Sequence, residues 1–214
     1  MLRFGLWWAS AMCDFPARLL HRLALGNPVV LEVNFALERR FFAARSPVSV
    51  AVPHVFVSGL ARSGTTVLMR ALYDSMEFSV LTYRDMPFVL APNTWAKIAA
   101  GSRPQMGEVE RAHGDGLRIG FDSPEALEEV FWWVFGGNYI RKDRLVSVLL
   151  ADESIVAFRV YIDLINRRYN KKRYLSKNNN LLRLTALLRA FPRRQAAPTG
   201  KYRVSAAGRE FSRK

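Results

Sequence analysis

The sequence is nearly free of cysteine: its 214 residues include only Cys13. A chain with one cysteine cannot form an internal disulfide, and a reducing, cytoplasmic location fits that count. The sequence also lacks the run of roughly 20 apolar residues that a membrane-spanning helix needs. Its apolar run from Phe4 to Met12 is short and is followed by Asp14. Arg3 and Ala9-Ser10-Ala11 loosely resemble a secretion signal, but a packed N-terminal helix is the preferred interpretation.

Acidic residues are almost absent from the last quarter of the chain. Residues 1–166 contain 17 basic and 17 acidic residues, whereas residues 167–214 contain 15 basic residues and a single acid, Glu210. The net charge of +14 therefore arises entirely from this C-terminal part. A solvated surface or an irregular tail explains this positive charge without a binding partner. The alternative is non-specific contact with polyanions or anionic lipid; no specific nucleic acid is expected.

The chain divides by composition into three parts. Residues 1–49 have leucines and aromatics at helical spacing, and they are predicted to form a helical N-terminal extension with two helices over residues 17–45. Asn27 is the expected cap of the second helix and Pro28 its first residue. Residues 50–192 form the predicted α/β domain. Residues 193–214 contain no Leu, Ile, Met or Trp, so we expect a basic, poorly ordered tail.

Within the α/β domain the pattern alternates between short β-rich runs and helices. The strands are predicted at residues 54–58, 80–83 and 174–176, and the helices at residues 65–76, 87–100, 123–135, 152–169 and 179–190. A strand–loop–helix–strand order indicates a parallel unit, so the expected fold is α/β with a short parallel sheet and helical insertions. Residues 101–120 are polar and glycine-rich and are predicted to form a long surface loop.

The most informative segment is the loop from Gly59 to Thr66. A strand that leads through a glycine-bearing loop into a helix N-terminus creates an anion-binding site, because the first helical amides lack partners. The spacing from Gly59 to Gly64 matches a Walker A loop, but Thr65 stands where the phosphate-binding lysine belongs. No aspartate at a strand end is evident to hold Mg²⁺. These features argue against ATP hydrolysis and for a ligand with one phosphate at this position. A tight strand–helix turn without a ligand is the alternative.

The run Arg62-Ser63-Gly64-Thr65-Thr66 resembles the 5′-phosphosulfate loop of the sulfotransferase superfamily. The likeness is to bacterial and protein or carbohydrate sulfotransferases, and it covers residues 50–192. Three further segments support the resemblance but are less specific: Thr82-Tyr83-Arg84-Asp85-Met86-Pro87, Arg111-Ala112-His113-Gly114-Asp115-Gly116 and Tyr174-Leu175-Ser176-Lys177-Asn178. The resemblance implies a three-layer fold like that of P-loop proteins. It also implies sulfuryl transfer from 3′-phosphoadenosine-5′-phosphosulfate (PAPS) to a hydroxyl or amine of a protein, carbohydrate or small molecule, without a metal.

The same resemblance implies roles for individual residues. Arg62 would stabilise the leaving phosphate, and the residues that follow it, Ser63, Gly64, Thr65 and Thr66, would bind the cofactor. Lys177, at the end of the third strand, would contact the cofactor or acceptor, or else cap backbone carbonyls.

An acceptor hydroxyl also needs a base. Asp85 is the first candidate and His113 the second. The simpler explanations are a salt bridge or turn for Asp85 and a solvated loop residue for His113. Glu125, Glu128 and Glu129 are explained by the dipole of the helix predicted to start at residue 123.

The resemblance stops at Pro192. The sulfotransferase family has a strand and an Arg-Asp-Pro segment at this point, which bind the 3′-phosphate, whereas this sequence continues with Arg193-Arg194-Gln195-Ala196. A truncated or altered relative that binds nucleotide without turnover is therefore the main alternative to an active sulfotransferase. A P-loop kinase or nucleotidase is a further alternative, which Thr65 disfavours.

Overall fold

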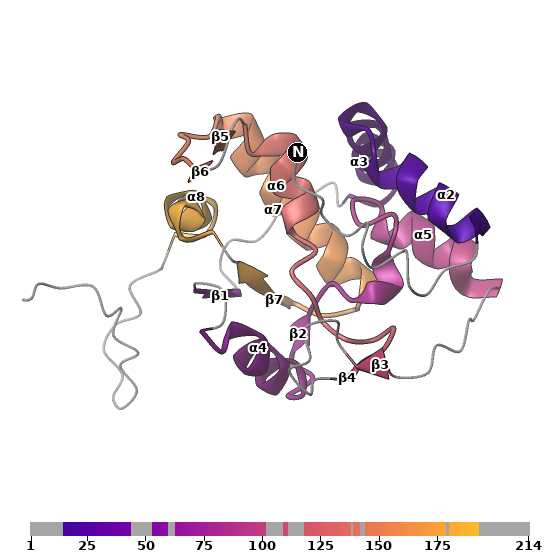
Figure 1. Cartoon of the computed structure of the whole chain (residues 1–214). Helices are drawn as coiled ribbons and strands as arrows, with labels where there is room; N and C mark the ends of the chain where they lie inside the picture. The colour runs from indigo at the N-terminus through magenta and orange to yellow at the C-terminus, as the bar shows by residue number, and fades with distance from the viewer. Residues whose placement is uncertain are drawn as a thin grey trace, which may run out of the picture.

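The computed structural model describes residues 15–43, 53–59, 63–101, 109–110, 118–137, 139–141, 144–178 and 180–192. The α-helices are α2 (Phe15–Leu25), α3 (Pro28–Phe42), α4 (Thr65–Tyr73), α5 (Pro92–Ile98), α6 (Glu129–Phe135), α7 (Asp152–Arg168) and α8 (Leu184–Ala190). The strands are β1 (Val55–Ser58), β2 (Phe78–Ser79), β3 (Val109–Glu110), β4 (Arg118–Ile119), β5 (Ile140–Arg141), β6 (Arg144–Leu145) and β7 (Arg173–Asn178). Figure 1 shows their arrangement.

The central sheet has the order β1-β7-β2, with β7 parallel to both neighbours. Val55 of β1 lies opposite Leu175, and Phe78 of β2 lies opposite Arg173. The predicted parallel sheet is thus confirmed. In this sheet β7 lies between β1 and β2, although β1 and β2 are consecutive strands in the sequence. The strand predicted at residues 80–83 is wrong in position: pairing occurs at Phe78–Ser79, and Thr82 forms only an isolated bridge with Pro124.

Helices cover both faces of this sheet. Because side chains alternate along a strand, consecutive residues of β7 enter different clusters: Tyr174 packs with the core of α6 and α7, and Leu175 packs with Met69 of α4. Figure 1 shows α4 on one side of the sheet and α6 and α7 on the other. The mixed α/β fold expected from the sequence is therefore present.

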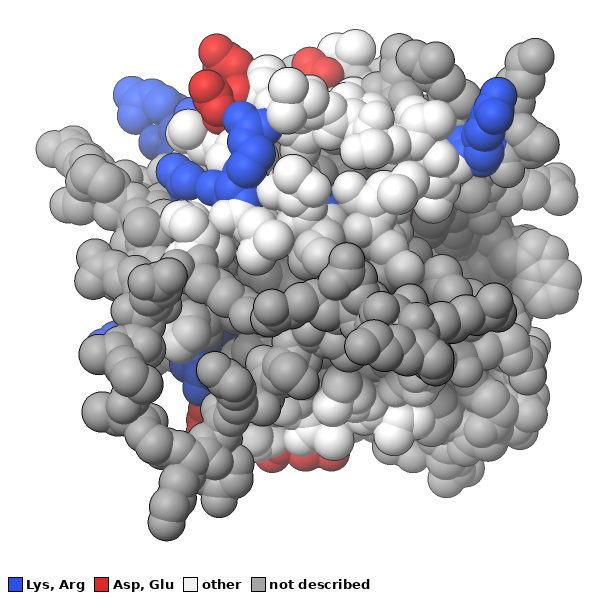
Figure 2. All heavy atoms as spheres, turned by 90° about the vertical axis from the view of Figure 1, so that its left-hand side faces the viewer, with Lys and Arg blue, Asp and Glu red and all other residues white. Residues whose placement is uncertain are grey.

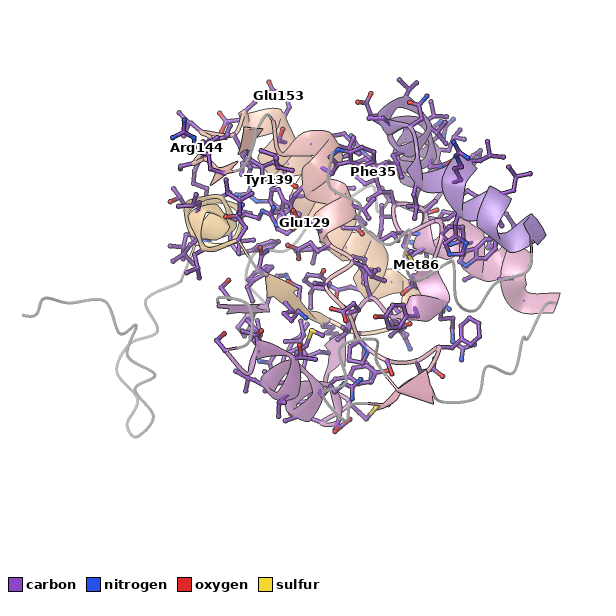
Figure 3. The ribbon with its side chains drawn as sticks, viewed as in Figure 1. Phe35, Met86, Glu129, Tyr139, Arg144 and Glu153 are labelled. Carbon is purple, nitrogen blue, oxygen red and sulfur yellow. The ribbon has the colours of Figure 1, made fainter. Side chains whose placement is uncertain are left out.

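The N-terminal helices pack on the larger of these clusters. Asn27 accepts a hydrogen bond from the Val29 amide at 2.9 Å and Pro28 starts α3, which confirms the predicted cap and break. Phe35 of α3, which is labelled in Figure 3, contacts Phe131 and Tyr161 at ring-centroid distances of 5.9 and 6.0 Å. The helix α3 is therefore part of the core that supports the sheet.

A buried carboxylate fixes α3 against the start of α5. Glu38 is fully buried, and its two oxygens accept four hydrogen bonds, from the amides and side chains of Asn93 and Thr94, at 2.6–3.1 Å. A negative charge at a helix N-terminus also complements the helix dipole. The helix predicted at residues 87–100 begins later, because Pro92 is the first residue of α5, where its missing amide hydrogen costs nothing.

The segment before α6 differs from the sequence prediction. The helix begins at Glu129 rather than at Ser123, because the Ser123 hydroxyl accepts from the Gly120 amide and Pro124 bridges to Thr82. Its end at Gly136 agrees with the prediction, and Gly137 follows at φ 67°. In the predicted loop at residues 101–120, the two described pairs of residues form an antiparallel ladder, β3 with β4.

Half of the eight described basic residues of the last quarter form ion pairs. Four ion pairs join them to acids from earlier elements, namely Arg173–Glu77, Lys177–Glu125, Arg183–Glu129 and Arg189–Asp152. Figure 2 shows basic and acidic side chains side by side on the face around α8. The charge imbalance along the sequence therefore does not create an equal imbalance on the folded domain. Within the described residues, no helix has the length and apolar character needed to cross a bilayer.

His54 caps the start of the sheet in its neutral form. Its Nδ1 accepts a hydrogen bond from the Tyr174 amide at 3.1 Å, which requires that nitrogen to be unprotonated, and its ring packs edge-on against Phe191. Burial, and then the charge of Arg173, lower the pKa of His54 from 6.5 to about 4.

The Glu38→Gln variant is expected to lower the free energy of unfolding by about 3 kcal/mol, because an amide cannot accept all four hydrogen bonds and brings two donors of its own. Urea unfolding measures this loss. Glu32→Gln is the matched control, since Glu32 is an exposed carboxylate of the same helix, and it should change stability by less than about 0.5 kcal/mol. Equal effects of the two substitutions would contradict the buried role of Glu38.

Acid should destabilise the fold through His54. Between pH 6.5 and 4 the unfolded chain binds a proton at His54 that the folded chain does not, so this contribution to stability falls as the pH falls through that window. Above pH 6.5 the contribution is complete. Urea unfolding at several pH values, compared between the wild-type chain and His54→Asn, isolates the effect because carboxylate contributions cancel. If the free energy of unfolding changed with pH in the same way in both proteins, His54 would not be the cause of the acid destabilisation.

Candidate functional site

The loop after β1 is shaped by two glycines. A Cβ on Gly59 would lie 2.6 Å from the Ser63 hydroxyl and 2.7 Å from the Thr65 methyl group, so any larger residue at this point would require those two side chains to move. Gly64 has φ 78°, a left-handed conformation that glycine adopts without strain. The loop residues Leu60, Ala61 and Arg62 lie outside the described residues, so the structure does not place the predicted catalytic arginine.

The loop ends at the N-terminus of α4. Gly64 is the N-cap residue and contributes no side-chain hydrogen bond to the helix, so the amides of the first turn have no capping side chain there. Thr65 and Thr66 are the first two helical residues and are partly exposed. Their amides and hydroxyls, together with the helix dipole, are suited to an anionic oxygen cluster.

Lys177 reaches this helix end from the neighbouring strand. Its Nζ lies 3.0 Å from the Thr66 hydroxyl oxygen, although the two residues are 111 positions apart in the sequence. The side chain is 5% exposed. The parallel pairing of β7 with β1 explains the encounter, because it places the carboxyl ends of both strands at the same edge of the sheet. The predicted cofactor-binding residues Thr66 and Lys177 are therefore in contact.

Glu125 completes this cluster and was not identified as a site residue from the sequence. Its Oε1 accepts a hydrogen bond from Lys177 Nζ at 2.9 Å, and its Oε2 accepts one from the Tyr83 hydroxyl at 3.2 Å. The sequence predicts Glu125 in the first turn of a helix, whereas in the structure it lies before α6. No local signal distinguishes it, because its partner is 52 residues away.

A buried polar network holds the end of β7 in place. The backbone oxygen of Asn178 accepts from the Gly59 amide at 3.3 Å, and its side chain bonds Glu128 and Arg183, each at 2.9 Å. Arg183 also forms two hydrogen bonds to Glu129, at 2.6 and 2.9 Å. Figure 3 shows Glu129 close to Tyr139, whose hydroxyl donates to it.

The two glutamates of this network differ in pKa. Burial raises the pKa of Glu128. Burial also acts to raise that of Glu129, but hydrogen bonds and charge from Arg183 outweigh it and lower the pKa.

Asp85, the first candidate for the base, is buried and stabilises a turn. Its Oδ2 accepts hydrogen bonds from the Thr82 amide at 2.9 Å and from the Tyr169 hydroxyl at 2.5 Å, and the side chain is 1% exposed. Burial raises its pKa. These contacts join the turn at residues 82–85 to the end of α7. The adjacent Arg84 pairs with Asp122 rather than with Asp85. His113, the second candidate, lies outside the described residues.

Comparisons with protein-family models, with curated proteins and with solved structures find no match for this chain. Within the described residues, no group of three or more histidine, cysteine, aspartate or glutamate side chains could hold a metal ion. Any assignment of function therefore depends on the residues of the site itself.

A double-mutant cycle tests whether the Lys177–Glu125 pair is as tightly coupled as its burial indicates. Lys177→Met, Glu125→Gln and the double variant are expected to give a coupling free energy of about 2 kcal/mol in urea unfolding, because each single change leaves a poorly solvated charge. Arg173–Glu77 is the control pair, at 2.5 Å but more exposed, and should give less than about 1 kcal/mol. A smaller coupling for Lys177–Glu125 than for the control would refute the prediction.

Proposed function

We propose that the chain is a sulfotransferase that binds PAPS at the N-terminus of α4 and transfers its sulfuryl group to a hydroxyl. The observation that carries the proposal is the contact of Lys177 with Thr66, at 3.0 Å, on the loop that resembles a 5′-phosphosulfate loop. It brings a positive charge to the first turn of the helix, where Thr65 replaces the lysine of a nucleotide triphosphatase loop. The architecture proposed for this site is the P-loop-like one, with helices on both faces of the parallel sheet.

Binding of the 5′-phosphosulfate would use groups that are already in position. The amides and hydroxyls of Thr65 and Thr66 would donate hydrogen bonds to the phosphate oxygens. In the transfer step the bond from sulfur to the phosphate oxygen breaks and a bond from sulfur to the acceptor oxygen forms. The phosphate keeps the electron pair, so negative charge grows on it. Lys177, with Arg62 from the loop, would stabilise that charge, and donors held in place before the reaction lower the barrier most.

The proton of the acceptor hydroxyl must go to a base, and Glu125 is the best placed carboxylate. It lies next to the Lys177 ammonium group, 2.9 Å from it, and its side chain is 15% exposed. An incoming phosphate group would compete for Lys177 and so leave Glu125 Oε1, which would keep its hydrogen bond from the Ala126 amide, able to accept the proton. Asp85 is less suited to this role, because its bonds to Thr82 and Tyr169 hold it in a buried turn.

Isothermal titration calorimetry with adenosine 3′,5′-bisphosphate, AMP and ATP–Mg²⁺ tests the proposal. The bisphosphate should bind tightest, and Lys177→Met should weaken it at least tenfold, since a charge-assisted hydrogen bond contributes about 1.5–3 kcal/mol. Lys172→Met is the matched control, because Lys172 is an exposed lysine just before β7, and it should leave the affinity unchanged.

The other outcomes identify the alternatives. Equal or absent binding of all three nucleotides would reject the sulfotransferase and leave a relative that has lost its function. Tight binding of ATP–Mg²⁺ with weak binding of the bisphosphate would indicate a kinase or nucleotidase. Unchanged affinity in Arg62→Ala and Lys177→Met would show that the nucleotide binds away from this loop.

A further inference from the structure

The outer surface of α2 and α3 carries many exposed apolar side chains. On α3 the buried residues Leu31, Phe35 and Glu38 define the inner side. The opposite side repeats apolar residues every four positions, with exposed fractions of 62% for Val29, 51% for Val33 and 51% for Leu37. Adding the other exposed apolar residues of both helices gives a set that we call the α2–α3 apolar surface: Leu19, Leu20, Leu23, Val29, Val30, Val33, Leu37 and Phe41. Figure 1 shows both helices at the edge of the molecule, beside α5.

Single exposed leucines are ordinary, but a set of eight on two consecutive helices is not. The helix α3 is apolar on two opposite sides: one side packs in the core through Phe35, and the other faces outward through Val33 and Leu37. A helix that only covered the core would need polar residues on its outer side. The outer apolar residues therefore indicate a second contact.

The charged residues on the same two helices are mainly basic. Arg22, Arg39 and Arg40 are exposed, whereas the exposed acid in the described part of these helices is Glu32. By helical spacing, Arg40 lies between the positions of Val29 and Val33 around the axis of α3. The sequence before α2 adds further apolar residues, Leu2, Phe4, Leu6, Trp7 and Trp8, with one base, Arg3, and one acid, Asp14.

We propose that the α2–α3 apolar surface binds the surface of a bilayer that contains anionic lipid. Leucine, valine and phenylalanine side chains would enter the boundary between headgroups and acyl chains, and the arginines would contact lipid phosphates. Apolar residues combined with arginines are the features of helices that lie in a membrane interface. Each basic residue near an anionic leaflet adds to the attraction, which weakens as salt screens it.

A second copy of the chain fits this surface less well. In a two-fold symmetric dimer the same patch meets itself, so the arginines of one copy would approach the arginines of the other. Like charges brought together without counter-charges disfavour association. An anionic membrane has the complementary charge and accepts the apolar side chains equally well.

Vesicle co-sedimentation of the full-length chain tests the proposal. Vesicles of phosphatidylcholine with 30% phosphatidylglycerol, and of phosphatidylcholine alone, are about equally suitable for apolar insertion but differ in charge. We expect binding to the anionic vesicles, weaker binding at high salt, and at least a tenfold lower partition coefficient in Leu37→Ser/Phe41→Ser. Arg22→Gln/Arg40→Gln should weaken binding to the anionic vesicles about tenfold and leave binding to neutral vesicles unchanged.

Leu184→Ser/Leu188→Ser is the matched control, because these α8 leucines are similarly exposed, at 51% and 45%, and should not affect vesicle binding. Circular dichroism and urea unfolding verify that all variants are folded. Absence of the wild-type chain from the vesicle pellet would overturn the proposal, and so would an equal loss of binding in the α8 variant. A dimer in light scattering that Leu37→Ser/Phe41→Ser dissociates, without vesicle binding, would assign the surface to a second copy instead.

Discussion

The position of β7 between β1 and β2 is the constraint on which the candidate site depends. Lys177 and Asn178 are the last residues of that strand, and the parallel register places them opposite Val57 and Ser58, immediately before the loop. Without this pairing the loop would have a helix end and two glycines but no lysine. The site is therefore formed by tertiary structure: one part comes from the loop and the other from a strand more than 100 residues later.

Buried polar groups maintain this arrangement. Glu38 joins α3 to α5, Asp85 joins a turn to the end of α7, and Glu128 joins α6 to β7. Each of these carboxylates is at most 1% exposed and accepts several hydrogen bonds. A buried charge with its partners in place adds little net stability, but it is very costly in any arrangement that removes them. In this chain these contacts select one packing of the helices around the sheet.

The sequence predicts well the features that depend on neighbouring residues. The break at Asn27-Pro28, the helix end at Gly136 and the loop between β1 and α4 follow from capping, proline and glycine geometry, which are local. Ser123-Pro124 has the same local signals for a helix start, but there the bridge from Pro124 to Thr82 and the bond from Ser123 to Gly120 are formed instead. The pairing of Glu125 with Lys177 was also missed, since it depends on a contact between distant parts of the chain.

The replacement of the Walker lysine by Thr65 has a physical consequence for the site. The helix end still needs a positive charge if it is to bind a phosphosulfate, and among the described residues Lys177 brings one from the adjacent strand. That charge is balanced in the free protein by Glu125, so the buried lysine is not left uncompensated. An anionic ligand would exchange one counter-charge of Lys177 for another, and Glu125 would lose its ion pair while keeping the hydrogen bonds from the Tyr83 hydroxyl and the Ala126 amide. The ion pair with Glu125 compensates the buried charge of Lys177 in the unliganded protein. Ligand binding would break this ion pair, and the Glu125 carboxylate could then accept a proton.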